Sequence, residues 1–121
     1  MKIKLRLSDI LFSKYIRARD NWTCQRCHTK YPESHRGLHC SHWQRRGKEN
    51  TRHDPENTIA LCMGCHLLWE GPTEEYTAFM EKRLGTERLK ALRVRAELYK
   101  KRDDKLDVLI CKQFLSTINL K

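Results

Sequence analysis

The chain has 121 residues and carries 25 Lys and Arg against 15 Asp and Glu, a formal net charge of +10. This length fits one compact domain, and the basic surplus attracts polyanions, so nucleic acid is the first partner to consider, although charge alone does not distinguish an enzyme from a binding protein. No stretch approaches the roughly 18 apolar residues of a membrane span, which argues against a membrane partner and leads us to expect a cytoplasmic protein.

The first predicted element is a helix over about residues 8–20. Ser8-Asp9 is typical of an N-cap, an apolar stripe runs to about Arg19, and Asp20-Asn21 ends the helix. Turn residues and the first pair of cysteines follow in residues 22–35. This segment predicts a knuckle and a loop, whose residues serve as metal ligands rather than as part of the apolar core.

Two short strands and a helix are predicted next. Residues 36–43 and 58–62 have strand patterns, and the polar connection between them is rich in Arg, Lys and Asn. These segments predict a hairpin with a long basic loop. Gly64-Cys65-His66 opens a short helix that Gly71-Pro72 ends, which completes a ββα unit.

Helices are predicted for most of the remaining chain. Thr73 caps a helix over about 73–83, Gly85-Thr86 marks a break, and a longer helix starts at Glu87. The apolar face of this longer helix comprises Leu89, Leu92, Ala96 and Tyr99. Residues 105–121 fit a terminal helix or a strand, because β-branched residues weaken the helical pattern. The predicted fold class is α+β.

Four of the six cysteines form two CxxC pairs, Cys24-Gln-Arg-Cys27 and Cys62-Met-Gly-Cys65. Each two-residue spacer lets both sulfurs reach one ion, so the pairs predict a closed, tetrahedral four-thiolate Zn²⁺ site. Such a site keeps no open position for a substrate, so this zinc is assigned to folding. The paired spacing disfavours four independent buried thiols or a redox site. Cys40 and Cys111 are expected to be small apolar residues of the core.

Three further residues stand in the order His42, Asn57, His66 across the two strands and the start of the helix. The run 38–43, LHCSHW, followed by 57–66, NTIALCMGCH, resembles the HNH endonuclease pattern, in which a strand-borne His precedes an N…LCxxCH block. The resemblance covers about residues 22–70. Together with Arg45 and the run 51–57, it is similar to phage-encoded HNH nucleases and, more loosely, to NinG-type phage recombination proteins.

This resemblance implies a single HNH nuclease domain over residues 1–121. It comprises a zinc-stapled, treble-clef-like ββα-metal core over about 22–70, with helical extensions at 8–20 and 73–121. The implied activity is metal-dependent hydrolysis of DNA phosphodiester bonds, by nicking or cleaving the duplex. A monomer or weak homodimer is expected, in the cytoplasm of a bacterial host if the chain is phage-encoded.

Each residue type suits one task in that reaction. His42 is predicted to be the general base, because a neutral imidazole with an ordinary pKa of about 6.5 can take a proton from water. His66 is predicted to bind the catalytic divalent ion, Mg²⁺ or Mn²⁺, and Asn57 to fix the orientation of the base. Four basic residues of the loop between the strands are expected to pair with DNA phosphates: Arg45, Arg46, Lys48 and Arg52.

Ser41 departs from the family pattern, since many HNH proteins carry Asp or His directly before the base as a second metal ligand. Ser41 would be a weak ligand at best, which leaves three outcomes open. Water fills the position, or His39 or Asp54 substitutes, or the metal is bound too weakly for efficient cleavage. The last outcome would make the chain a noncatalytic, zinc-stabilised DNA-binding or recombination accessory protein.

Overall fold

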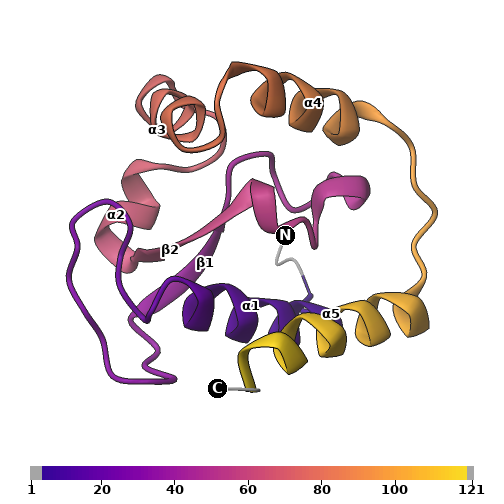
Figure 1. The fold of residues 1–121 in the computed structure, drawn as a ribbon, viewed down its shortest axis with the longest axis horizontal. Helices are drawn as coiled ribbons and strands as arrows, with labels where there is room; N and C mark the ends of the chain where they lie inside the picture. Colours follow the sequence, from indigo (N-terminus) through magenta and orange to yellow (C-terminus); the bar gives the residue numbers. More distant parts are fainter. Residues whose placement is uncertain (1–3, 120–121) are drawn as a thin grey trace.

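The computed structural model describes residues 4–119, which form an α+β fold with a two-stranded antiparallel sheet and five α-helices (Figure 1). In chain order the elements are α1 Leu7–Arg19, β1 Leu38–His42, the 3₁₀ turns η1 Glu49–Thr51 and η2 Pro55–Asn57, β2 Thr58–Cys62, α2 Met63–Leu68, α3 Glu74–Leu84, α4 Thr86–Glu97 and α5 Asp104–Asn119. No helix within the described range has the length and apolar character needed to traverse a bilayer.

The β1–β2 hairpin lies between two pairs of helices, with α1 and α5 side by side on one side and α3 and α4 on the other (Figure 1). Its register pairs Leu38 with Cys62 at one end and His42 with Thr58 at the other. The short helix α2 continues directly from β2. A two-stranded sheet is marginal alone in water, so the helices on both sides stabilise it by covering its faces.

Two apolar clusters hold these layers together. The larger one joins the hairpin to α2, α3 and α4 and contains Leu38, Trp43, Ile59, Leu61, Trp69, Tyr76, Met80, Leu89 and Leu92. The smaller one joins α1 to β1 and α5 through Phe12, Ile16, Cys40 and Cys111. Both cysteines are buried free thiols, as predicted, and burial raises the pKa of each to about 12.

Two details of the predicted helices are wrong. The first helix begins at Leu7, and Asp9 lies at its third position, where the carboxylate accepts a hydrogen bond from the Arg6 backbone N–H at 2.9 Å. The helix α4 ends at Glu97, and the Tyr99 side chain is 90 % exposed rather than on the apolar face. The sequence leaves the C-terminal segment open between a helix and a strand, because its β-branched residues weaken the helical pattern. In the structure residues 104–119 form a helix that packs along α1.

A buried polar network centred on Asp9 ties α1 to the hairpin loop and to α5. Arg52, which is only 4 % exposed, donates to both oxygens of the Asp9 carboxylate at 2.6 and 2.9 Å. His53 lies 3.0 Å from the same carboxylate and 3.8 Å from Asp107 on α5. The prediction that Arg52 contacts DNA is therefore wrong, because its guanidinium group is buried in an ion pair.

Asp9→Asn is expected to lower the free energy of unfolding at pH 7 by about 3–5 kcal/mol, because it leaves Arg52 buried without its counter-ion. Burial alone would raise the pKa of Asp9, but hydrogen bonds from His53, Arg52 and the Arg6 N–H hold it well below its ordinary value. The folded state thus favours the ionised carboxylate. Its stabilisation is fully present above the unfolded pKa of about 3.9 and is lost as the pH falls below it.

Urea denaturation of wild type and Asp9→Asn between pH 3 and pH 7 tests this expectation. On acidification the free energy of unfolding should decrease less in the variant than in wild type. Glu97→Gln is the matched control, because the exposed Glu97 pairs with Lys48 and its loss should change the free energy of unfolding by less than about 1 kcal/mol. An unchanged pH dependence in Asp9→Asn would contradict the assignment.

Candidate functional site

The four cysteines of the CxxC pairs meet in space. Cys24 and Cys27 come from the loop after α1, Cys62 ends β2, and Cys65 lies in the first turn of α2. All four Sγ atoms lie within 4.8 Å of one another. Two thiolates bound to one tetrahedral Zn²⁺ at about 2.3 Å would be separated by about 3.8 Å. The Cys27 and Cys62 sulfurs are 3.8 Å apart, so the cluster fits such an ion.

Hydrogen bonds point to these sulfurs, and the pKa of one of them, Cys27, is lowered. The backbone N–H of Cys27 points to Cys24 Sγ at 3.5 Å, and that of Cys65 to Cys62 Sγ at 3.4 Å. Hydrogen bonds from the Thr29 side chain and backbone lower the pKa of Cys27 to about 6. Burial raises the pKa of Cys65 to about 12, and metal ligation requires the deprotonated form, so a bound cation would have to offset this burial. The spacing of the four sulfurs lets the cluster hold a metal ion.

Two histidines from different elements meet beside the hairpin. His39 lies on β1 and His66 on α2, and their Nδ1 atoms are 3.0 Å apart. Two imidazole nitrogens at about 2.1 Å from one ion, in adjacent octahedral positions, would be separated by about 3 Å. Burial, and after it the neighbouring His39 ring, lowers the pKa of His66. A neutral imidazole is the form that binds a metal, so the pair suits a shared ion.

His42, at the end of β1, lines the same cavity as His66. This cavity has a volume of about 300 Å³, and its lining comprises Cys40, His42, Arg45, Arg46, Gly47, His66, Glu70 and Gly71. The structure therefore brings the predicted base and the predicted metal-binding histidine to one site.

The hydrogen bond of His42 defines its tautomer. Its Nε2 lies 2.8 Å from the backbone carbonyl oxygen of Arg52, which can only accept. Nε2 therefore carries the proton, and Nδ1 carries the lone pair. Burial lowers the pKa of His42 to about 4, partly offset by that carbonyl. At neutral pH the side chain is an uncharged imidazole that can accept a proton at Nδ1.

Asn57 holds the loop that carries this carbonyl. Its side chain is fully buried, and its amide donates to the carbonyl oxygens of Gln44 at 2.9 Å and Thr51 at 3.1 Å. Its own oxygen accepts the Gln44 N–H at 2.8 Å. Asn57 thereby fixes the residue before Arg52, and so places the acceptor that orients His42. This side chain acts on the base through the backbone rather than by direct contact.

The Ser41 hydroxyl points toward α3. The residue is fully buried, and its hydroxyl lies 3.0 Å from the phenol oxygen of Tyr76 on α3. Asp54, another candidate, pairs with Arg95 on α4 at 2.9 Å. The predicted weak ligand Ser41 is therefore wrong, and of the substitutes considered only His39 lies beside His66. The sequence marks His39 only by its place in the same strand as His42.

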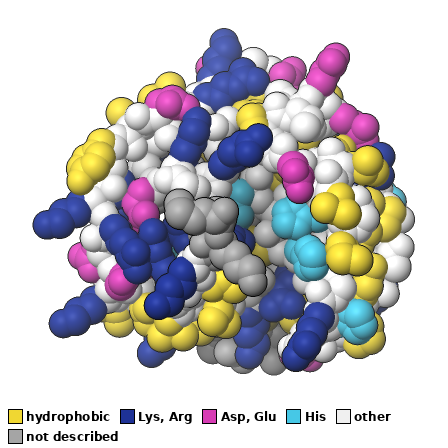
Figure 2. Space-filling model, turned by 180° about the vertical axis from the view of Figure 1, so that it is seen from behind, with side chains coloured by type: hydrophobic (Ala, Val, Ile, Leu, Met, Phe, Trp, Pro, Cys, Tyr) yellow, Lys and Arg dark blue, Asp and Glu magenta, His cyan; other side chains and the backbone are white. Residues whose placement is uncertain are grey.

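Two of the four predicted DNA-contacting residues lie at the cavity. Arg45 is exposed and Arg46 half-buried, and both line it. Gly71 has a φ of +72°, which favours glycine, and a Cβ there would lie 3.0 Å from Nε of Arg45, so glycine leaves room for this side chain. Lys48 instead pairs with Glu97 on the neighbouring helix α4. Figure 2 shows histidine side chains gathered on one face with Lys and Arg on both sides of them.

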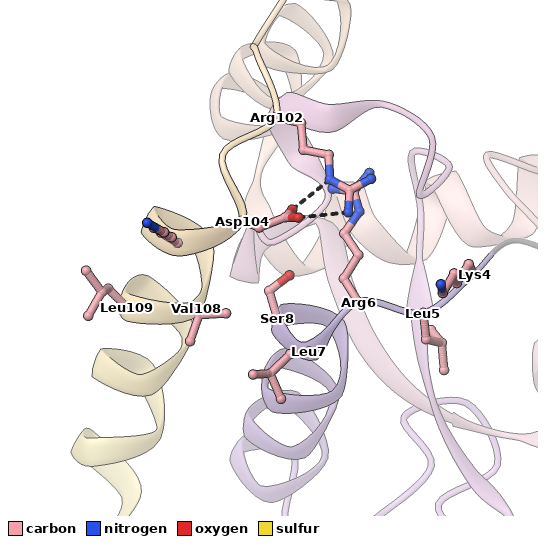
Figure 3. Close-up of a pocket in the computed structure, with 10 residues that line it drawn as sticks. Lys4, Leu5, Arg6, Leu7, Ser8, Arg102, Asp104, Val108 and Leu109 are labelled. Carbon is pink, nitrogen blue, oxygen red and sulfur yellow. Dashed lines mark hydrogen bonds and ion pairs between the residues drawn. The ribbon is translucent and has the colours of Figure 1, made fainter.

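A larger cavity lies elsewhere. A groove of about 820 Å³ separates the start of α1 from the start of α5, and side chains from both helices point into it (Figure 3). Its lining combines four aliphatic residues with five charged ones. Leu5, Leu7 and Leu109 are exposed by more than half, and Arg102 pairs with Asp104. No histidine or cysteine lines this groove. The histidines and cysteines considered above lie at the hairpin instead.

Comparison of this chain with protein-family models, curated proteins and solved structures found no match.

Proposed function

We propose that the chain is a metal-dependent DNA endonuclease of the HNH type that hydrolyses phosphodiester bonds. The observation that carries the proposal is the shared cavity of His42 and His66. His42 has its lone pair on Nδ1, and burial lowers its pKa to about 4, so the imidazole is neutral at neutral pH and can accept a proton there. His39 and His66 together fit one divalent ion.

Each group would have a separate role in the reaction. His42 Nδ1 takes a proton from the attacking water, while the Arg52 carbonyl keeps the ring in place. His39 and His66 hold Mg²⁺ or Mn²⁺, which would stabilise the charge that develops on the phosphate and leaving oxygen. Arg45 and Arg46 lie where they can pair with phosphate oxygens. The four cysteines hold a structural Zn²⁺ that clips the knuckle loop to the hairpin.

One observation favours a second candidate, a noncatalytic zinc-stabilised DNA-binding or recombination accessory protein. With Ser41 buried against Tyr76, the described residues at the site offer only two imidazole donors to the ion. A site with few protein ligands binds metal weakly, and a chain that never loads the ion would bind DNA without cutting it.

A supercoiled plasmid assay separates the two candidates. Wild type is expected to convert supercoiled plasmid to the open circle when Mg²⁺, Mn²⁺ or Ni²⁺ is added, the last because imidazole also suits nickel. His39→Ala and His66→Ala should raise the metal concentration for half-maximal rate by at least about tenfold. His35→Ala is the control, because His35 is exposed and lies outside the cavity.

The outcomes are distinct. Plasmid that stays supercoiled with every ion, yet is retarded in a gel by the protein, would identify the noncatalytic candidate. Equal cleavage by wild type, His39→Ala and His66→Ala would show that the histidine pair does not hold the ion. Zinc content and far-UV circular dichroism of each variant establish that the fold is retained.

A further inference from the structure

Two half-buried arginines near the histidines lack the acidic partners that many other arginines have. Carboxylates pair with the guanidinium groups of Arg6, Arg19, Arg26, Arg52, Arg88, Arg95 and Arg102. Within residues 4–119, no carboxylate lies within ion-pair distance of Arg17 or Arg46, although both side chains are half-buried. A partly desolvated cation without a counter-ion is costly, and an incoming anion would offset that cost.

Arg17 and Arg46 line one cavity of about 520 Å³ between α1 and β1, together with Ser13, His39 and His66. This cavity shares Cys40, Arg46 and His66 with the smaller cavity of His42. The two cavities therefore adjoin. They form a trough that leads from α1, past the histidine pair, to Gly71.

The trough has an excess of positive charge. Asp9 lines its α1 end, but Arg52 and His53 engage both oxygens of that carboxylate. Glu70 is exposed at the opposite end. The inner part of the trough therefore presents arginine and histidine to a ligand.

The two arginines are placed differently along it. Arg17 is held by a hydrogen bond from its Nε to the Ser13 carbonyl oxygen at 3.2 Å, and its guanidinium lies 5.0 Å from the centre of the Trp22 ring. Its two terminal nitrogens have no hydrogen-bond partner among the described residues. The Nε of Arg46 is buried and has no partner there either. Of the two arginines, only Arg46 lines both cavities, so it is the one that shares a cavity with His42.

We propose that this trough binds the backbone of the DNA strand that is cut. Arg46 holds the phosphate beside the histidines, and Arg17 holds a phosphate farther along the same strand, toward α1. The proposal rests on the proposed endonuclease function and adds the path of the strand and a contact from a helix outside the ββα core. Arginine suits this role, because its planar fork of N–H donors matches two phosphate oxygens.

DNA binding without added divalent ion tests the inference apart from cleavage. A fluorescent 20-base-pair duplex is titrated with protein at several salt concentrations. Arg17→Gln and Arg46→Gln should each weaken binding by about tenfold and lower the salt slope by about 0.9, the value for one lost phosphate contact. Arg17→Lys should keep the slope. Arg36→Gln is the matched control, because Arg36 is exposed and lines neither cavity.

Cleavage kinetics then separate the two arginines. Arg17→Gln should raise KM and leave kcat within about threefold, whereas Arg46→Gln should lower kcat, because Arg46, unlike Arg17, lines the cavity of His42. Arg17→Met, which keeps the aliphatic stem over Trp22, replaces the Gln variant if the latter loses its fold.

The outcomes distinguish this inference from the function on which it rests. If Arg17→Gln matches wild type and Arg36→Gln in affinity, salt slope and KM, while wild type cleaves DNA, the strand path is wrong and the endonuclease assignment stands. If wild type neither binds nor cleaves DNA, the proposed function itself fails, and the inference with it.

Discussion

Cys62→Ser is expected to abolish zinc binding and to unfold the chain at 25 °C. Cys62 joins β2 to α2 and contributes its sulfur both to the four-cysteine cluster and to the backbone N–H of Cys65. Structural zinc contributes about 10–16 kcal/mol of binding free energy in small zinc domains. A domain of this size is stable by only about 5–15 kcal/mol in total. Weakening the site by one ligand therefore removes a large share of the stability.

Elemental analysis and thermal melting followed by circular dichroism check this expectation. Wild type should contain one zinc per chain and melt cooperatively, and Cys62→Ser should show neither property. Cys111→Ser is the matched control, because Cys111 is a buried free thiol on α5 that packs against α1, away from the cluster. The control should keep its zinc and lose about 1–3 kcal/mol for a buried hydroxyl. Wild type that melts cooperatively without zinc would refute the structural role of the ion.

His42→Gln is expected to lower the rate of DNA cleavage by about 10²–10⁴, the usual contribution of a general base. Glutamine can still donate to the Arg52 carbonyl, so the variant removes the proton acceptor and keeps the hydrogen bond that holds the loop. Zinc content and melting temperature should stay close to those of wild type. The exposed His35→Ala serves as control and should cleave at the wild-type rate.

The pH dependence of the wild-type rate is a second measurement on the same residue. A base works in its deprotonated form, so its rate falls as the pH drops through its pKa. Burial lowers the pKa of His42 to about 4, so the rate should stay level across the ordinary histidine range near pH 6.5 and decline only toward pH 4. A threefold or smaller loss in His42→Gln, or a steep decline centred near pH 6.5, would assign the proton transfer to another group.

Local patterns in the sequence predict the centre of this molecule well. The strand over 58–62 has the predicted bounds, and the predicted N-cap Thr73 does cap α3. Both predictions succeed because hydrophobic periodicity and helix capping depend on residues that are close in the sequence. The CxxC spacing likewise implies the four-sulfur cluster, since each pair is a local turn. The zinc and DNA roles stay predictions.

The errors concern residues whose partners lie far along the chain. Arg52 reads as one more basic residue in a polar loop, and its burial depends on Asp9, 43 positions earlier. Ser41 stands beside His42 in the sequence, yet Tyr76, 35 positions later, places its hydroxyl in the core. The importance of His39 depends on His66, 27 positions away. Periodicity and composition carry no information about such pairings, because tertiary packing creates them.

The hairpin register links the two candidate metal sites. Strand β1 carries His39 opposite Leu61, and Cys62 stands opposite Leu38, so one residue separates the two sites along the ladder. A slip of one residue would turn every side chain of a strand to the other face of the sheet. It would separate His39 from His66 and withdraw Cys62 from the other sulfurs in a single event. A substitution that removes zinc and cleavage together therefore indicates a misaligned hairpin. Loss of cleavage alone indicates that the substitution affects the histidine site.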